Sequence, residues 1–460
     1  MQNEKTAPIA ESSDRKSRGY AKGKPNSPAS MDNSNLNSDH LIQALIAKEN
    51  LVAVVKRVES NKGAAGCDSL EVSLLREYLQ KHWPRIKSEL LDGTYKPLPV
   101  KRVEIPKPGG GMRKLGIPSV VDRFIQQALH QILSPIFEPI FSQSSFGFRV
   151  GRSAHDAVLS AKEHMSQGYR FVVDLDLDSF FDRVNHDILM SRVARKVKDK
   201  KVLLLIRRYL QSGVLIDGVI ETSSSGTPQG GPLSLLLSNI LLDDLDKELE
   251  WRGHRFCRYA DDVNIYVRSK RSGERVLASV SHFIESRLKL KINYRKSAVA
   301  RPWDRKFLGY SVTMHKKPRL RVALKSLARL KASLKQVLRR GRGRNLGRFV
   351  KEELNPILRG WGNFFYLSET KLSLEELNKW IRHRLRCLLW KQWKKPKTRF
   401  KRLVALGINT CRASESVSNG RGSWWNSGAS HINNAIRNKH FEKIGLISVL
   451  KQVNRMKSLA

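Results

Sequence analysis

The chain of 460 residues has few cysteines, few acidic residues and no long apolar run, and each shortage argues against a class of protein. The four cysteines are scattered without a Cys-x-x-Cys pair, which argues against a zinc knuckle or a disulfide framework and favours a reducing compartment. No stretch of about 18 apolar residues is present, and the N-terminus has no apolar signal-peptide region. We therefore expect no membrane partner and a location in the cytoplasm or on the nucleoid.

The shortage of acidic residues leaves a large positive charge. The 85 Lys and Arg residues outnumber the 42 Asp and Glu residues, which gives a formal net charge of +43 and a pI near 10.4. Charge of one sign on this scale repels itself, and the phosphate backbone of a nucleic acid is the polyanion that best balances it. The composition therefore predicts a nucleic-acid partner.

Two of the few aspartates stand side by side in "FCRYADDVNIYV" (256–267), between apolar runs. The alternation of apolar and polar residues after Asp262 predicts a half-buried strand, which puts Asp261 and Asp262 in a tight turn between two strands. Neighbouring carboxylates repel each other, and burial increases the repulsion unless a cation lies between their oxygens. Surface turns are commonly acidic, so this pair alone is weak evidence for chemistry.

A second acidic segment strengthens the case for a cation. The sequence "RFVVDLDLDSFFD" (170–182) predicts a strand on which Asp174, Asp176 and Asp178 share one face, because alternate side chains of a strand point the same way. Mg²⁺ prefers carboxylate oxygens, and two-metal phosphoryl transfer needs a further carboxylate that contacts both ions. In a strongly basic chain this combination indicates nucleotidyl transfer with two Mg²⁺ ions, for which Mn²⁺ can substitute.

The composition changes along the chain and predicts four segments. Residues 1–38 are rich in Ser, Asn, Lys and Pro, and we expect them to be a disordered tail. Helices alternate with short strands over 39–315, whereas 316–402 has 27 basic and 5 acidic residues and a helical apolar pattern. Residues 403–460 form a mixed segment that contains Gly, Ser and Trp. The expected fold class is α+β followed by an α-helical region.

The basic segment 316–402 combines a predicted core with a predicted RNA-binding surface. Four leucines spaced 3, 4 and 4 residues apart lie on one helix face: Leu327, Leu330, Leu334 and Leu338. Further on, arginines and lysines alternate with Trp380, Trp390 and Trp393, a mixture that suits phosphate contacts and base stacking in structured RNA. The alternative for these tryptophans is burial inside a helix bundle, and both can hold for different members.

Eight sequence blocks, in order, resemble those of group II intron-encoded proteins, the bacterial reverse transcriptase/maturases. The blocks are "IPKPGGGMRKLGIP", "DRFIQQAL", "SFGFRVGRSAHDA", "DLDSFFDRVNHD", "GTPQGGPLSLLLSNILL", "RYADD", "INYRKS" and "FLGY". The segment "NPILRGWGNFFYLSE" (355–369) resembles the maturase block of this family, and 419–436 resembles the C-terminal segment of members without an endonuclease domain.

The resemblance implies a right-hand polymerase with fingers and a palm that contains an antiparallel sheet, over 39–315. An α-helical thumb and maturase region at 316–402 follows, and then a C-terminal maturase and DNA-binding segment at 403–460 without an endonuclease domain. It also implies that Asp176, Asp261 and Asp262 are the catalytic residues that bind metal. Asp174 matches the family pattern less well and is expected to be structural.

The resemblance further implies a nucleotide site beside these aspartates. Lys107 and Arg113 match residues that grip the triphosphate, and Gln229 matches a position beside the nucleotide and template. Phe180 matches the bulky residue under the sugar that excludes a 2′-hydroxyl, with Phe181 as its neighbour. Lys296 matches a lysine that acts as a general acid toward pyrophosphate.

The expected function is RNA-directed DNA synthesis combined with maturase activity, with intron RNA, an RNA template with a DNA primer or target DNA, and deoxynucleotides as partners. Two alternatives remain at this point: an RNA-binding splicing factor with an idle polymerase, and a polymerase that serves host defence or repair. The predicted RNA-binding residues are Arg339, Arg340, Arg342, Arg344, Trp361, Lys394 and Lys395.

Overall fold

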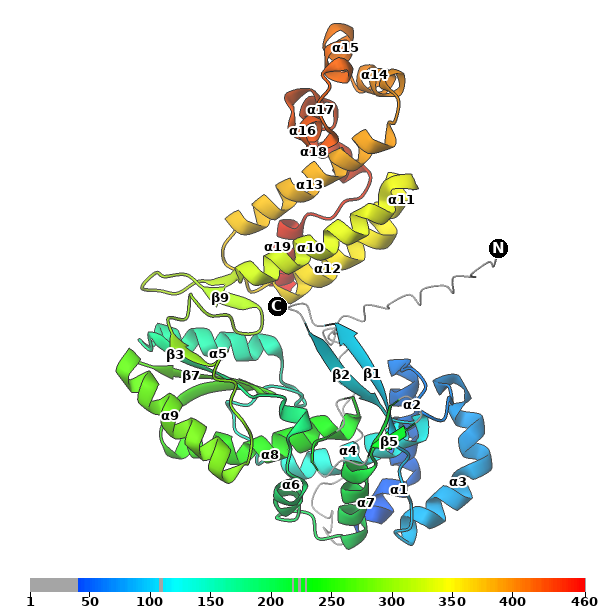
Figure 1. Ribbon diagram of the computed structural model, residues 1–460, viewed down its shortest axis with the longest axis vertical. Coiled ribbons are helices and arrows are strands. Elements are labelled where there is room, and N and C mark those ends of the chain that lie inside the picture. Colours follow the sequence, from blue (N-terminus) through cyan, green and yellow to red (C-terminus); the bar gives the residue numbers. More distant parts are fainter. Residues whose placement is uncertain (1–39, 107–110, 217–218, 222–224, 228–229, 460) are drawn as a thin grey trace, which may run out of the picture. The chain divides into compact units, whose positions relative to one another are not determined.

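The computed structural model describes residues 40–106, 111–216, 219–221, 225–227 and 230–459. They fold into two compact units that divide between Arg319 and Leu320, close to the predicted limit at 315–316 (Figure 1). The predicted tail at 1–38 lies outside the described residues, and so do Lys107 and Gln229. None of the described helices is long and apolar enough to cross a lipid bilayer.

The first unit begins with helices that pack around α4 (Val120–Phe137). Residues 41–61 form two helices, because the backbone leaves the helical conformation at Ala47 (ψ 138°). Helix α4 begins where the Ser119 hydroxyl accepts a hydrogen bond from the Asp122 amide (3.0 Å). The other helices of this part are α1 (Leu41–Ile46), α2 (Lys48–Asn61) and α3 (Leu75–Leu91).

One four-stranded sheet of the first unit has the order β2-β1-β4-β5. Strands β1 (Val100–Pro106) and β2 (Met112–Ile117) pair antiparallel and form the two arms of a hairpin. Strand β4 (Val214–Ile216) extends the sheet in parallel to β1, and β5 (Val219–Glu221) closes it. We refer to this sheet as the fingers sheet.

A second four-stranded sheet, the palm sheet, has the order β6-β7-β3-β8, and each strand is antiparallel to its neighbours. Strands β6 (Arg255–Tyr259) and β7 (Asp262–Val267) are joined by a two-residue turn, as the alternation in the sequence predicted. Strand β3 (Phe171–Asp176) lies between β7 and β8 (Ala298–Ala300). The two acidic segments are therefore neighbouring strands of one sheet.

The two faces of the palm sheet are covered differently. Val173, Leu175 and their partners across β7 are fully buried and pack in the core with the apolar side of α9 (Lys270–Arg287). Helix α5 (Ala154–Ser166) packs on the other face, where the His164 ring lies 5.3 Å from that of Tyr266. Figure 1 shows α5 and α9 on opposite sides of the strands. Tyr266 pairs with Val172, so α5 covers the end of the strands away from Asp176.

Three further helices complete the first unit: α6 (His186–Val193), α7 (Lys200–Gln211) and α8 (Pro232–Trp251). Helix α8 is buried along most of its length and packs against α4, α6 and β6. It contains the apolar run "LSLLLSNILL", so that run is a core helix.

The second unit consists mainly of helices. In α10 (Leu324–Arg340) the side chains of Leu330, Leu334 and Leu338 are buried and Leu327 is half-buried, which confirms the predicted apolar stripe. The remaining helices of this unit are α11 (Leu346–Phe349), α12 (Asn355–Phe364), α13 (Leu372–Gln392), α14 (Pro396–Ala405), α15 (Thr410–Ser418), α16 (Ser423–Gly428), α17 (Ser430–Ala435), α18 (Asn438–Lys443) and α19 (Val449–Leu459).

Residues on both sides of the predicted limit at 402–403 pack together in this second unit. The Asn355 side chain donates a hydrogen bond to the Gly445 carbonyl (2.7 Å), and Arg386 donates to the Ile436 carbonyl (2.9 Å). Segments 316–402 and 403–460 therefore share one core.

Candidate active site

The palm sheet brings the three predicted aspartates together. Asp176 is the last residue of β3 and lies directly opposite Asp262, the first residue of β7. Directly opposed residues of an antiparallel pair project from the same face with neighbouring Cβ atoms. Asp261 lies in the turn immediately before β7. By contrast, Asp178 lies beyond the end of β3 and pairs with Arg183 (3.0 Å), so the shared face ends at Asp176.

Burial and like charge raise the pKa values of Asp261 and Asp262. Burial, followed by the charges of Asp174 and Asp261, raises the pKa of Asp262 to about 8. Burial also raises the pKa of Asp261, against the lowering effect of the charges on Arg113 and Lys296. Simultaneous ionisation of Asp261 and Asp262 is therefore unfavourable, and a bound cation would make it less unfavourable.

Asp174 lies two residues before Asp176 on the same face of β3, and burial raises its pKa. The Arg305 guanidinium opposes that shift, with its Nε 3.0 Å from Asp174 Oδ2. This partner agrees with the structural role predicted for Asp174.

The chemistry of the donors fits Mg²⁺, which binds oxygen ligands and is usually held by one or two carboxylates together with substrate phosphates. Among the described residues, no three metal-binding side chains already converge as a complete protein site. The Lys296 ammonium lies 3.2 Å from Asp176 Oδ2, which brings the predicted general acid to the carboxylates. Asp176, Asp261 and Asp262 therefore supply part of a coordination shell that a substrate would complete.

The fingers sheet contributes positive charge beside the carboxylates. Arg113 on β2 is close enough to Asp261 for its charge to lower the pKa of that group. A cavity of about 250 Å³ lies against the same sheet, and its wall includes Arg102, Lys114, Phe181 and Thr227. Arg102, Lys114 and Thr227 were not predicted as site residues from the sequence.

Thr227 differs from the other residues of this cavity because its side chain is buried. Its Oγ1 has no hydrogen-bond partner among the residues that the structure describes. A buried hydroxyl without a partner is costly, so a hydrogen-bonding ligand in this cavity would be favoured.

The position of Phe180 does not support the role predicted for it. Phe180 is 3% exposed and belongs to the hydrophobic core, whereas Phe181 is half-buried and lines the cavity. The strand ends at Asp176, Ser179 adopts a left-handed conformation (φ 50°), and residues 180–182 form a 3₁₀ turn. The alternation of a strand therefore no longer applies at Phe180, and its neighbour faces the cavity.

Gly230 of the "TPQGG" block lies close to the backbone of β2. A Cβ atom at this position would lie 2.4 Å from the Gly116 carbonyl oxygen on β2, and its φ of +148° is one that side chains rarely adopt. Gly230 is therefore packed tightly against the fingers sheet.

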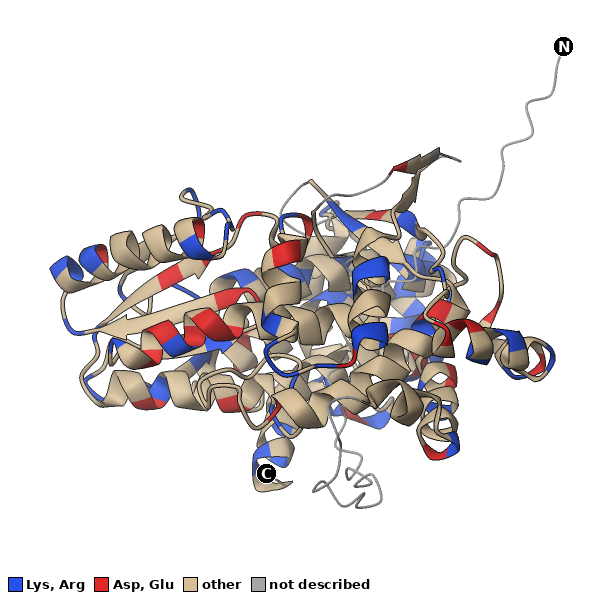
Figure 2. Ribbon diagram, turned by 90° about the horizontal axis from the view of Figure 1, so that it is seen from below, with Lys and Arg blue, Asp and Glu red and all other residues tan. Residues whose placement is uncertain are grey.

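In the second unit, the predicted RNA-binding cations are exposed. They are Arg339 and Arg340 at the end of α10, Arg342, Arg344, and Lys394 and Lys395 after α13; Arg344 also forms an ion pair with Glu353. Figure 2 shows Lys and Arg on many elements of the chain, interspersed with Asp and Glu. The basic surface is thus built from several helices.

The tryptophans of this unit divide between core and surface. Trp390 is 2% exposed and therefore packs in the core, and Trp361 is half-buried with its ring 4.5 Å from Phe365. Trp424 and Trp425 on α16 are 44% and 46% exposed and were not predicted as binding residues. His383 stacks on Trp424 at 3.9 Å, and Arg421 lies 4.2 Å from the Trp425 ring. The sequence feature that could have identified Trp424 and Trp425 as binding residues is the pair of tryptophans close to an arginine in "GRGSWWN".

Two protein families match the chain over consecutive segments. Residues 105–312 match the family described as "Reverse transcriptase (RNA-dependent DNA polymerase)", and residues 327–407 match "Group II intron, maturase-specific domain". These segments fall in the first and second structural unit, apart from the loops outside the described residues.

Individual proteins also resemble parts of the chain. "Protein YkfC" of Escherichia coli (strain K12) is 32% identical over 304 residues, which are 57% of this chain and 80% of YkfC. "Group II intron-encoded protein LtrA" of Lactococcus lactis subsp. cremoris is 38% identical over 208 residues, which are 45% of this chain but only 34% of LtrA. Among solved structures, "Partial Cas6-RT-Cas1--Cas2 complex" has a TM-score of 0.35 and 26% identity, over 53% of this chain and 42% of that one.

The carboxylate cluster predicts a pH-dependent stability in the absence of metal. Because the folded-state pKa of Asp262 is raised to about 8, its contribution to stability is fully present below the ordinary carboxyl pKa and is lost as the pH rises through about 8. With EDTA present, the melting temperature should therefore fall between about pH 5 and about pH 8, and fall less in Asp262→Asn. Thermal denaturation at both pH values measures this difference.

The control variant is Asp187→Asn, since Asp187 is exposed and pairs with Arg207 on the surface. Its melting temperature should fall as much as that of the wild type. An equal fall in the Asp262→Asn protein would contradict the electrostatic description of the cluster.

Proposed function

The chain belongs to the group II intron reverse transcriptases that carry a maturase-specific domain, and on this premise we propose that it copies RNA into DNA and binds intron RNA to assist splicing and intron mobility. The observation that carries the proposal is the direct opposition of Asp176 and Asp262 across two strands, with Asp261 in the adjoining turn. An idle polymerase has no need to maintain three carboxylates that repel one another.

The three aspartates hold the metal ions of the reaction. When bound, two Mg²⁺ ions lower the pKa of the primer 3′-hydroxyl and neutralise charge on the departing pyrophosphate. Arg113 lies near this cluster and contributes positive charge toward the triphosphate, a role that Lys107 on the same hairpin shares. Lys296, which contacts Asp176, is placed to give a proton to the leaving pyrophosphate.

In this proposal Phe181 selects the sugar of the incoming nucleotide. Its ring lines the cavity beside the fingers sheet, where Arg102 and Lys114 supply charge for phosphate oxygens. A bulky ring under the sugar leaves no space for a 2′-hydroxyl, so ribonucleotides are rejected by steric exclusion. Gln229, beside Gly230, contacts the nucleotide and template in this proposal.

The second unit binds the intron RNA. Its exposed arginines and lysines neutralise phosphates, and Trp361 offers a partly exposed ring. Trp424 and Trp425 support the nucleic-acid role proposed for 403–460, because exposed rings flanked by cations suit base stacking. Such a partner places the protein in a cytoplasmic ribonucleoprotein.

The first test of this proposal is Asp261→Asn. Loss of one charged metal ligand should lower primer extension on an RNA template by at least about a hundredfold, since even indirect support of metal ligands is worth 10–100-fold. Intron RNA affinity and splicing should remain, because the residues proposed for them lie in the second unit. Filter-binding, splicing and primer-extension assays on one preparation separate these activities, and near-normal DNA synthesis would contradict the proposed site.

The second test compares two neighbouring aromatic residues. Phe181→Ala should raise the efficiency of ribonucleotide incorporation relative to deoxynucleotides by about 10-fold or more, because space opens under the sugar. Phe180→Ala is the matched control: it should lower stability by about 3–5 kcal/mol and leave sugar selection unchanged, since Phe180 is a core residue. Single-nucleotide insertion kinetics measure both, and the opposite assignment of the two effects would refute the role of Phe181.

The third test removes phosphate contacts from the second unit. Changing Arg339, Arg340, Arg342 and Arg344 together to Ala should weaken intron RNA binding and flatten the slope of log affinity against log salt by about 0.7–0.9 for each phosphate that is no longer neutralised. Splicing at low magnesium should decline, whereas extension of a short primer–template should change less.

A matched control for this variant changes four exposed basic residues of α9 to Ala: Lys270, Arg271, Arg275 and Arg287. This helix covers the palm face opposite the carboxylates, so the control loses the same charge at a site without a proposed RNA contact. If both quadruple variants lost the same affinity, the binding would depend on net charge alone.

A further inference from the structure

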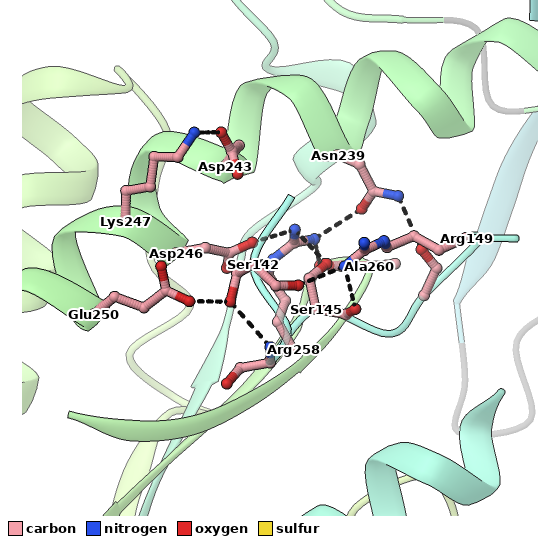
Figure 3. Close-up of polar contacts among 12 residues, drawn as sticks. Ser142, Ser145, Arg149, Asn239, Asp243, Asp246, Lys247, Glu250, Arg258 and Ala260 are labelled. Carbon is pink, nitrogen blue, oxygen red and sulfur yellow. Dashed lines mark hydrogen bonds and ion pairs between the residues drawn. The ribbon is translucent and has the colours of Figure 1, made fainter. Parts of the chain in front are cut away.

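A fully buried ion pair lies behind the turn that carries Asp261 and Asp262. Arg258 on β6 pairs with Val263 on β7. Their side chains therefore project from the face of the sheet that is opposite to the face of Asp176 and Asp262. There the Arg258 guanidinium meets the Asp246 carboxylate of α8, and both side chains are 0% exposed. Figure 3 shows the pair with the residues around it.

All five N–H donors of this guanidinium are used. Nε and Nη2 donate to the two carboxylate oxygens of Asp246 (2.7 and 2.5 Å), which is a bidentate pair. Nη1 donates to Asn239 Oδ1 (2.9 Å) and to the carbonyl of Ala260 in the turn (3.1 Å), and Nη2 also donates to Ser145 Oγ (2.7 Å). One side chain thus connects α8, the segment before α5 and the turn itself.

The turn that Arg258 contacts has an unfavourable backbone conformation. Ala260 has a φ of 57°, in the left-handed region that residues other than glycine seldom adopt. Gly147 packs against it so closely that a Cβ atom would lie 2.4 Å from the Ala260 nitrogen, and the Asn239 amide holds the Gly147 carbonyl (2.8 Å). A strained conformation persists only where its surroundings determine it fully.

The neighbouring segment is itself fixed by hydrogen bonds. The Phe146 amide donates to the Arg258 carbonyl and the Arg258 amide donates to the Ser144 carbonyl, both at 2.9 Å. Arg149 donates to the Ser145 carbonyl (2.9 Å) and forms an ion pair with Glu138 (2.8 Å). The groups that Arg258 uses as supports are therefore rigid, which a positioning device requires.

We propose that Arg258 is a positioning residue that sets the location of the Asp261 and Asp262 carboxylates relative to Asp176, and thereby the affinity of the site for divalent metal. The inference rests on the proposed two-metal function. Stability alone does not account for the arrangement, because buried ion pairs are often no more stabilising than apolar side chains of similar volume. The fork of the guanidinium, by contrast, reaches the turn and α8 at the same time.

Arg258→Lys tests the proposal, because lysine retains the charge beside Asp246 but offers three donors on one nitrogen in place of a planar fork. The full chain with bound primer–template is titrated with Mn²⁺ and followed by electron paramagnetic resonance, which needs no catalysis. We expect Mn²⁺ affinity to fall about 10-fold or more, the range seen when support of metal ligands is removed. The half-saturating Mg²⁺ concentration for primer extension should rise in parallel, with primer–template affinity unchanged.

The matched control is Arg192→Lys, in which the same change is made to an arginine that contacts Asp244 of the same helix (2.8 Å) away from the turn. Its Mn²⁺ affinity should equal that of the wild type. If Arg258→Lys does not fold, Asn239→Ala provides the test, since it leaves the ion pair intact and removes the contacts to Arg258 and Gly147. Circular dichroism shows which variants are folded.

The outcomes separate the positioning role from the proposed function. A folded Arg258→Lys or Asn239→Ala protein with wild-type Mn²⁺ affinity overturns the positioning role, as does an equal loss in Arg192→Lys. Failure of the wild type to bind Mn²⁺ in the presence of primer–template overturns the two-metal function itself, and the inference with it. Weaker binding in every test variant that folds, with normal binding in the control, supports the proposal.

Discussion

Electrostatic repulsion among carboxylates is the constraint around which the first unit is built. Asp174, Asp176, Asp261 and Asp262 come from two strands and one turn of a single sheet, and burial raises the pKa values of Asp174, Asp261 and Asp262. Such a group stays together only where the backbone fixes it, because the side chains themselves favour separation. The core packing of β3 and β7, the capped helix α5 and the buried pair behind β6 provide that fixation.

Positive charge is arranged on two scales around this constraint. Close to the carboxylates, Lys296 and Arg305 each contact one aspartate, and Arg113 acts on Asp261 from the fingers sheet. Elsewhere the excess of Lys and Arg is spread over exposed helix faces, where water screens it and a polyanion can reach it. The first arrangement suits small phosphate groups at a fixed point, and the second suits a long phosphate backbone.

The sequence was most informative where one physical rule acted alone. Alternating apolar residues around Asp261 located two strands and their turn, and the leucine spacing located the buried face of α10. It did not show which of Phe180 and Phe181 lines the cavity, because a 3₁₀ turn replaces the strand after Asp176 and changes the directions of the two rings. It also gave no sign of Arg258, whose partners lie 12, 19 and 113 residues away and meet it only in the folded chain.

The pairing of Arg258 with Asp246 also restricts how the gene can change. Loss of either partner alone would leave an uncompensated charge in the protein interior, which is far more harmful than exchange of both for apolar residues. The two codons are therefore coupled. A single substitution that removes the charge of one partner is harmful unless the other partner changes as well. A descendant of this chain that lost DNA synthesis would be freed from the requirement at Asp261 but would still face the barrier at Arg258, so the buried pair should outlast the activity.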